Sequence, residues 1–229
     1  MIDAEAIRRL DVTRVAWLRN SGMSVLLALL VTIVFVVPAL VSFGETWRLL
    51  VDVMLTLILV SGVVAVIDHR RLALVLVVLS ALVIVVRWAE WLVPADMLPA
   101  VRNFTSLSAL LVLALAVGIN VFASGHSIKD RVFGAIVLYL LIGLIWAVAY
   151  SAIARHSAAA FAGHPGGDTG LADWVYFSFV TLTTVGYGDI TPVAQGARAL
   201  ATLEAFIGQL YPAIIIARLV SLQVNSQHS

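Results

Sequence analysis

Long apolar runs separated by short polar stretches recur from one end of the chain to the other. A helix rises about 1.5 Å per residue, so roughly 20 apolar residues cross about 30 Å of hydrocarbon. Six runs reach this length, at about residues 23–43, 47–67, 71–90, 103–123, 131–153 and 197–221. The pattern predicts an all-α membrane protein with six transmembrane helices.

The segment between the fifth and sixth runs departs from this pattern. Residues 171–183 are apolar and aromatic for about three helical turns, which is too short to span, and residues 184–189 read Thr-Val-Gly-Tyr-Gly-Asp. Irregular backbone at membrane depth is tolerated only where it is buried in protein or lines a water-filled path. We therefore expect a re-entrant pore helix over 171–183 and a pore-lining loop over 184–189.

The loop carries the residue types that a row of backbone ligands requires. Gly186 and Gly188 enter backbone regions that other residues avoid, which allows successive carbonyls to point the same way. The carbonyls of Thr184, Val185, Gly186 and Tyr187, with the Thr184 hydroxyl, can then replace the water shell of a monovalent cation.

Composition narrows the class of protein further. The mean hydropathy is +1.06 and only 12% of residues are charged, so we expect an integral membrane protein. The absence of cysteine excludes disulfides and zinc-thiolate sites, and a net charge of +1 gives no reason to expect nucleic-acid binding. No nucleophile, base and orienting group converge at a motif, so no enzyme activity is expected.

The motif Thr184–Asp189, with an aromatic half-helix before it and a span on either side, resembles the selectivity filter of the potassium channel family. The resemblance implies K⁺ as the permeant ligand and no other cofactor. It also implies four such loops around one axis, and because this chain carries one, a homotetramer with three further copies of itself.

The same resemblance implies residues that support the filter. Thr183 and Gly188 flank the ligand carbonyls, and Asp189 sits just outside them, where it accepts a hydrogen bond from the pore helix. Tyr176 is the favoured donor and Trp174 is the alternative. Val180 stands where some family members have a glutamate, so no carboxyl pair with Asp189 is expected.

The first four runs, residues 23–123, resemble the layout of a voltage-sensor domain without its charges. A sensor needs several arginines at every third position, because one charge gains only about 2.3 kcal/mol per 100 mV. The fourth run contains Arg102 alone. We expect no steep voltage gating, and we interpret Arg102 as an anchor at the outer interface.

The last run contains a candidate hinge. Pro212 cannot donate a hydrogen bond to the carbonyl of Gly208, so flexibility and a missing bond coincide there, although a static kink is an equal alternative. Below this point an apolar constriction that gates by dewetting is expected from Ile215, Ile216 and Leu219.

Two acidic residues lie within apolar runs. Glu204 is expected to hydrogen-bond the pore helix from behind, and the alternative is a position near water that attracts cations. Asp52 has Arg48 one turn earlier, which predicts a local ion pair.

Arginine and lysine predict the orientation, because nine lie on the side of the N-terminus and five on the other, which favours cytoplasmic termini. We divide the chain into an interfacial helix (1–22), the sensor-like four helices (23–123), a linker (124–130), a pore domain (131–221) and a cytoplasmic tail (222–229). No soluble regulatory domain is expected, and the arginine-rich, alanine-rich composition suggests a bacterial inner membrane.

Together these features predict a homotetrameric channel that passes K⁺ down its gradient, with membrane lipids as further partners. The alternative is a non-conducting or weakly selective membrane sensor with a vestigial pore.

Overall fold

A computed structural model describes residues 22–36, 46–65, 70–89, 99–122, 128–163 and 170–227. The predicted interfacial helix lies outside these residues except for Gly22, as do residues 124–127 of the predicted linker and the last two residues of the tail.

The described chain is almost entirely helical. The first segment, Gly22–Val36, is helical and its last five residues, Thr32–Val36, are π-helix. The following elements are α2 (Thr46–Ala65), α3 (Arg70–Ala89), α4 (Pro99–Phe122), α5 (Ile128–His156), a short 3₁₀ turn η3 (Ala158–Ala160), β1 (Phe161–Ala162), α6 (Leu171–Leu182), β2 (Thr191–Pro192) and α7 (Gln195–Gln227).

Three of the helices are long and apolar enough to cross a membrane. These stretches are Val101–Ile119 in α4, Arg131–His156 in α5 and Gln195–Ser221 in α7, and the apolar stretches of the other described helices are shorter. The structure therefore agrees with an all-helical membrane protein, and the expected number of six crossings remains a proposal.

Several predicted boundaries move. Helix α5 starts three residues earlier than expected, so the last part of the predicted linker is helical, and α7 is longer than the predicted run at both ends. Helix α6, the predicted pore helix, ends at Leu182 rather than at residue 183. Capping and frayed ends decide such limits, and apolar patterning does not report them.

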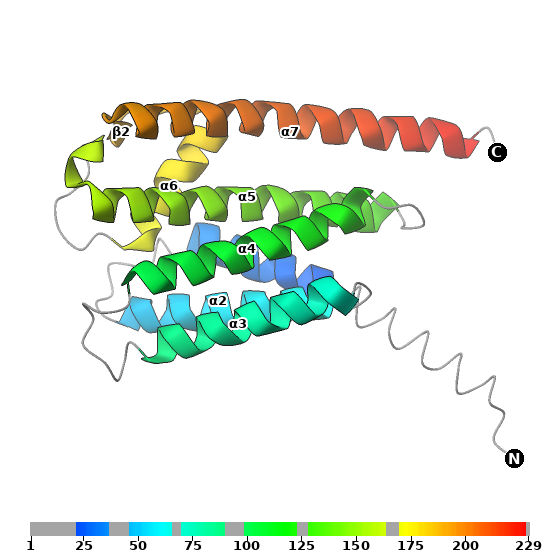
Figure 1. Cartoon of the computed structure of the whole chain (residues 1–229). Helices are drawn as coiled ribbons and strands as arrows, with labels where there is room; N and C mark the ends of the chain where they lie inside the picture. The colour runs from blue at the N-terminus through cyan, green and yellow to red at the C-terminus, as the bar shows by residue number, and fades with distance from the viewer. Residues whose placement is uncertain are drawn as a thin grey trace, which may run out of the picture.

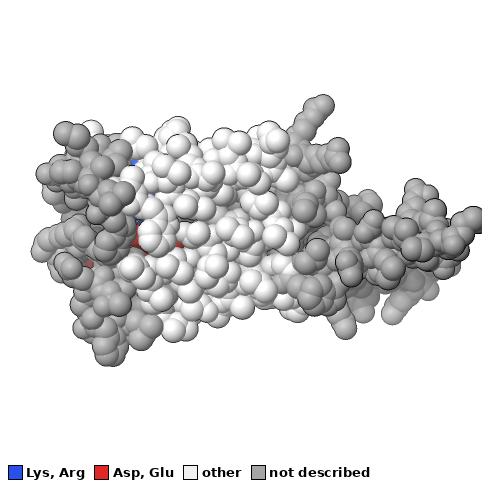
Figure 2. Space-filling view, turned by 90° about the horizontal axis from the view of Figure 1, so that it is seen from below, with Lys and Arg blue, Asp and Glu red and all other residues white. Residues whose placement is uncertain are grey.

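The helices form two groups joined by α5 (Figure 1). Helices α2, α3 and α4 pack on one another, and α4 lies against α5. On the other side of α5, the short helix α6 runs obliquely between α5 and α7. The described surface in Figure 2 is almost free of charged side chains, as expected for a face that meets lipid.

A small antiparallel pairing that patterning did not predict joins the two ends of the segment that contains α6 and residues 184–189. Phe161 of β1 pairs with Pro192 of β2, and the Val193 N–H donates to the carbonyl of Ala160 at 2.8 Å. These bonds tie the chain that follows residues 184–189 to the chain that follows α5.

Helix α7 is one continuous helix through Pro212, and its Gly208 lies close to the end of α6. A Cβ on Gly208 would lie 1.8 Å from the carbonyl oxygen of Leu182. The helix shows no break at Gly208 and Pro212. The close approach accounts for a glycine at position 208, and both the hinge and its alternative, a static kink, stay predictions.

We expect Gly208→Ala to destabilise the protein by at least about 1–3 kcal/mol, because the new methyl group meets backbone that cannot rotate away. Thermal unfolding of the purified protein in detergent measures the change. Gly196→Ala on the same helix is the matched control, since its Cβ would meet nothing within 4 Å and its effect should stay within about 0.5 kcal/mol. Equal destabilisation by Gly208→Ala and Gly196→Ala would contradict a packing role for Gly208.

Candidate ion-conduction site

The backbone of residues 184–188 alternates in handedness. The φ angles of Thr184, Gly186 and Gly188 are +60°, +57° and +80°, and Val185 and Tyr187 between them are not in the positive region. Alternation of this kind turns successive N–H groups to one side of the chain. The two glycines allow it without strain, and Thr184 is the one described residue other than glycine with a positive φ.

Hydrogen bonds fix the direction of the first peptide groups. The N–H groups of Val185 and Gly186 both donate to the carbonyl of Val180 at the end of α6, at 2.9 and 3.3 Å. In a trans peptide the C=O points opposite to the N–H. The carbonyls of Thr184 and Val185 therefore point away from α6.

A side chain of α7 holds the start of this segment. Gln209 Nε2 donates to the Thr184 hydroxyl at 2.8 Å. Thr183 donates its hydroxyl to the Phe179 carbonyl at 2.6 Å, which closes the end of α6. Beyond these contacts the segment is open in the single chain, with Val185 52% and Tyr187 72% exposed.

Asp189 is paired with α6 at the outer end of the segment. The hydrogen bond from the Tyr176 hydroxyl, followed by smaller backbone contributions, lowers the pKa of the Asp189 carboxyl below its ordinary value of 3.8. The same bond raises the pKa of Tyr176 to about 12. The Tyr176 ring is also parallel to that of Tyr187, with centroids 6.5 Å apart. Trp174, the alternative donor, is buried with its ring against Phe161 and Phe177.

Glu204 lies fully buried behind α6, where three helices meet. Its Oε2 accepts a hydrogen bond from the Tyr150 hydroxyl of α5 at 2.6 Å, and its Oε1 is 2.5 Å from Ser178 Oγ of α6. Ser178 Oγ is also 2.8 Å from the carbonyl of Gly143. The Ser178 hydroxyl has one proton, and a carbonyl only accepts. If Ser178 donates its one proton to the Gly143 carbonyl, its contact with Glu204 is a hydrogen bond only when Glu204 is protonated and donates to Ser178 Oγ.

An aromatic cluster surrounds this network. Tyr150 packs edge-on against Phe161 and Phe177, with ring centroids 5.8 and 4.9 Å apart, and its other side stacks on Trp146. Edge-to-face pairs of this kind add about 0.5–1.5 kcal/mol each beyond the area they bury. The cluster keeps the Tyr150 hydroxyl aimed at Glu204.

The three residues that were expected to form an apolar constriction differ in their burial within the chain. Ile215 is buried within its own chain and Leu219 packs against the same core, whereas Ile216 is exposed. Residues four apart share a helix face, so Ile215 and Leu219 face inward together. In the single chain Ile216 is thus the exposed member of the three, and the expected constriction stays a prediction.

Tyr150, Ser178 and Gln209 were missed by sequence reasoning. Gln209 carried a usable signal, because it is a polar residue next to Gly208 in an apolar run. Nothing in the sequence marked Ser178 or Tyr150 as a site residue, because serine and tyrosine are common in membrane helices. Their shared partner Glu204 lies 26 residues from Ser178 and 54 residues from Tyr150.

Comparison with known proteins shows which proteins this part of the chain resembles. Residues 134–224, which include α6, the segment after it and most of α7, match the family model described as "Ion channel". A stretch of 100 residues is 32% identical to two-pore potassium channel 1 of Arabidopsis thaliana, and 106 residues are 29% identical to potassium voltage-gated channel subfamily A member 5 of Mus musculus. These stretches of the chain are similar to potassium channels.

These similarities to potassium channels cover parts of each protein. The matched stretches are 43% and 45% of this chain, and 25% and 16% of the Arabidopsis and mouse channels. Protein LctB of Bacillus caldotenax is 48% identical over 50 residues, which are 22% of this chain and 37% of that protein. No solved structure matches the chain significantly.

We expect Tyr176→Phe to raise the pKa of Asp189 toward 3.8, because the largest contribution to its lowered value is the Tyr176 hydrogen bond. The Asp189 pairing contributes stability above that ordinary pKa, and the contribution is lost as pH falls through the lowered value. Carboxyl carbon NMR of aspartate-labelled protein measures the titration. Tyr187→Phe is the control, because it keeps a ring beside Tyr176, and an equal shift there would exclude the Tyr176 bond as the cause.

Glu204→Gln should preserve stability, because its amide N–H₂ donates to Ser178 and its carbonyl accepts from Tyr150, as a protonated acid does. Glu204→Ala should cost about 1–3 kcal/mol for each buried partner left unpaired. Thermal unfolding in detergent compares the two. A loss with Gln as large as that with Ala would show that Glu204 acts as a carboxylate.

Proposed function

We propose that the protein is a potassium-selective channel that conducts K⁺ passively as a homotetramer. The observation that carries the proposal is the direction of the Thr184 and Val185 carbonyls, which point away from α6 toward an open face. With the carbonyls of Gly186 and Tyr187 they form the ligand row, and the alternating φ angles continue through Gly188.

The exposed face of α7 supports assembly of copies. Only 17% of its most apolar stretch is buried within the chain, compared with 56% for that of α5. Exposed apolar residues along α7 include Leu203, Phe206, Leu210, Ile214, Ile216 and Val220. Three further copies around one axis would cover this face near the filter, and lipid would cover the remainder.

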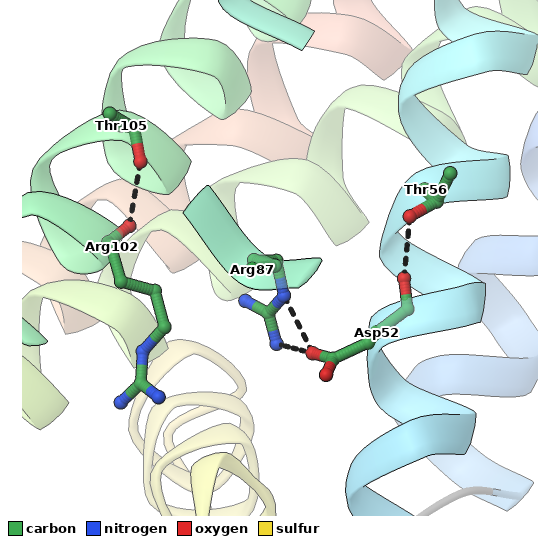
Figure 3. A network of polar contacts seen from close by, with 5 residues as sticks. All are labelled: Asp52, Thr56, Arg87, Arg102 and Thr105. Atoms are coloured by element: carbon green, nitrogen blue, oxygen red, sulfur yellow. Dashed lines mark hydrogen bonds and ion pairs between the residues drawn. The ribbon is translucent and has the colours of Figure 1, made fainter. Parts of the chain in front are cut away.

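The sensor-like half supports a channel that is not steeply voltage-gated. Arg102 is the single basic residue in α4, and Arg87 of α3 is paired with Asp52 of α2 (Figure 3). A charge held in such an ion pair does not move freely across the electric field of the membrane. We place the helices in six crossings of the cell membrane with both termini cytoplasmic, in line with the excess of arginine and lysine on that side.

A flux assay tests the proposal. The full chain in liposomes should take up K⁺ more than Na⁺, and barium should block the uptake. Equal Na⁺ and K⁺ flux would remove selectivity from the proposal. No flux under any gradient or pH would favour the alternative of a membrane sensor with a vestigial pore.

Gly186→Ala should abolish selective K⁺ uptake while leaving the protein inserted and assembled. An alanine at φ +57° is strained by about 1–2 kcal/mol, although its Cβ would meet nothing in the single chain. The expected loss therefore comes from carbonyl direction and not from a clash. Gly196→Ala, outside the ligand row, should conduct normally. Selective flux through Gly186→Ala would overturn the assignment of the filter.

A further inference from the structure

One strongly polar side chain of α7 takes no part in the network behind α6. Between Arg198 and Arg218 the helix carries two residues with a charge or an amide, Glu204 and Gln209. Glu204 is buried in that network, whereas the amide of Gln209 donates to the Thr184 hydroxyl at 2.8 Å. An amide within an apolar membrane helix is costly unless it is hydrogen-bonded. The bond to Thr184 is therefore the contact from which a role for Gln209 can be argued.

Two contacts one helical turn apart fix the register in which α7 passes α6. Ser178 of α6 lies 2.5 Å from the carboxyl of Glu204, and four residues later on both helices the carbonyl of Leu182 lies against Gly208. Residues four apart share a helix face. The contacts therefore advance in step along α6 and α7, and Gln209, the next residue of α7, comes to lie at the segment that follows α6.

Thr184 needs a support that the glycines of the row do not need. Its φ is +60°, in a region that β-branched residues rarely enter. Its N–H donates to the carbonyl of Thr181 at 2.9 Å, which holds the backbone on one side. The hydrogen bond from Gln209 holds the side chain on the other, so that the hydroxyl has one fixed position.

The direction of this hydrogen bond leaves the Thr184 hydroxyl able to bind a cation. A hydroxyl oxygen has two lone pairs and one hydrogen. The Gln209 amide uses one lone pair, so the second stays available to a cation that has lost its water shell. A hydroxyl held in place cannot move inward to contact a smaller ion such as Na⁺. The bond therefore favours the larger cation at this ligand.

We propose that Gln209 sets the discrimination of K⁺ from Na⁺ at the first site of the ligand row, by holding the Thr184 hydroxyl in the position of a ligand. The inference rests on the proposed channel function, because that site forms where four copies share one axis. Gln209 acts through Thr184 and is a positioning residue. Four such hydrogen bonds, one in each copy, surround the site.

A double-mutant cycle with the full chain in liposomes tests the role. Gln209→Met removes the donor and keeps an unbranched side chain, and Thr184→Val removes the hydroxyl and keeps the branched shape. Gln209→Met should lower the ratio of K⁺ to Na⁺ uptake about threefold to tenfold, the effect of one hydrogen bond, and Thr184→Val at least as much. In the Thr184→Val protein, adding Gln209→Met should lower the ratio no further, because the bond is already absent.

Gln195→Met is the matched control, because it makes the same chemical change at the first residue of α7 and should leave the ion ratio unchanged. A second measurement does not involve flux. Replacing Na⁺ by K⁺ at constant ionic strength should raise the unfolding midpoint of the parent protein in detergent saturably. Gln209→Met should match the parent midpoint in Na⁺ and need about three to ten times more K⁺ for the same rise.

The inference is overturned if Gln209→Met keeps the ion ratio of the parent, or if its effect is as large in the Thr184→Val protein as in the parent. Selective flux through the parent would then leave the proposed channel function standing. Absence of flux, together with a K⁺-dependent rise that Gln209→Met weakens, would overturn the channel function and support the role of Gln209 at the ion site. A parent chain that neither conducts nor responds to K⁺ would overturn both.

Discussion

The backbone direction of the candidate filter, residues 184–189, depends on the carbonyl of Val180. This carbonyl accepts two successive N–H groups, from Val185 and Gly186, and so fixes the direction of the carbonyls on the same peptide planes. A helix end normally leaves its last carbonyls unsatisfied. Here the same groups that complete α6 also orient the segment after it, and a shift of α6 would turn those carbonyls with it.

The position of α6 is in turn fixed from behind by polar contacts that reach two other helices. Glu204 of α7 joins Ser178 of α6 and Tyr150 of α5, and the close approach of Gly208 to the Leu182 carbonyl leaves no room for sliding. Buried polar networks are costly unless every member is satisfied, and a fully satisfied network favours one arrangement of its helices. Rigid support of this kind suits a site whose ligands are backbone atoms.

The sequence was sufficient for the parts of the structure that depend on local chemistry. The short helix α6 and the irregular segment after it follow from residue types and local patterning, and the pairing of Tyr176 with Asp189 was implied by the resemblance to the potassium channel family. Contacts between segments that are distant in the sequence could not be predicted from local chemistry. Asp52 was expected to pair with Arg48 one turn away, whose side chain lies outside the described residues, and the structure pairs it with Arg87 of α3, 35 residues later. Helical periodicity tells which residues share a face, and it does not tell which helix covers that face.

The single chain presents its carbonyl row on an open face, and this has a physical consequence for the proposed function. A cation that has lost its water shell needs oxygen ligands on all sides, while one chain supplies them on one side only. In the proposed tetramer, symmetric copies would supply the remaining ligands, and each copy would have to hold its carbonyls in the same direction, because one misdirected segment would disrupt the shared site. The anchoring of Val185 and Gly186 at Val180, the Gln209 bond to Thr184 and the Glu204 network all act within one chain. The direction of these carbonyls is thus set within one chain, so that in the proposed tetramer the interface between copies would only have to bring four such faces together.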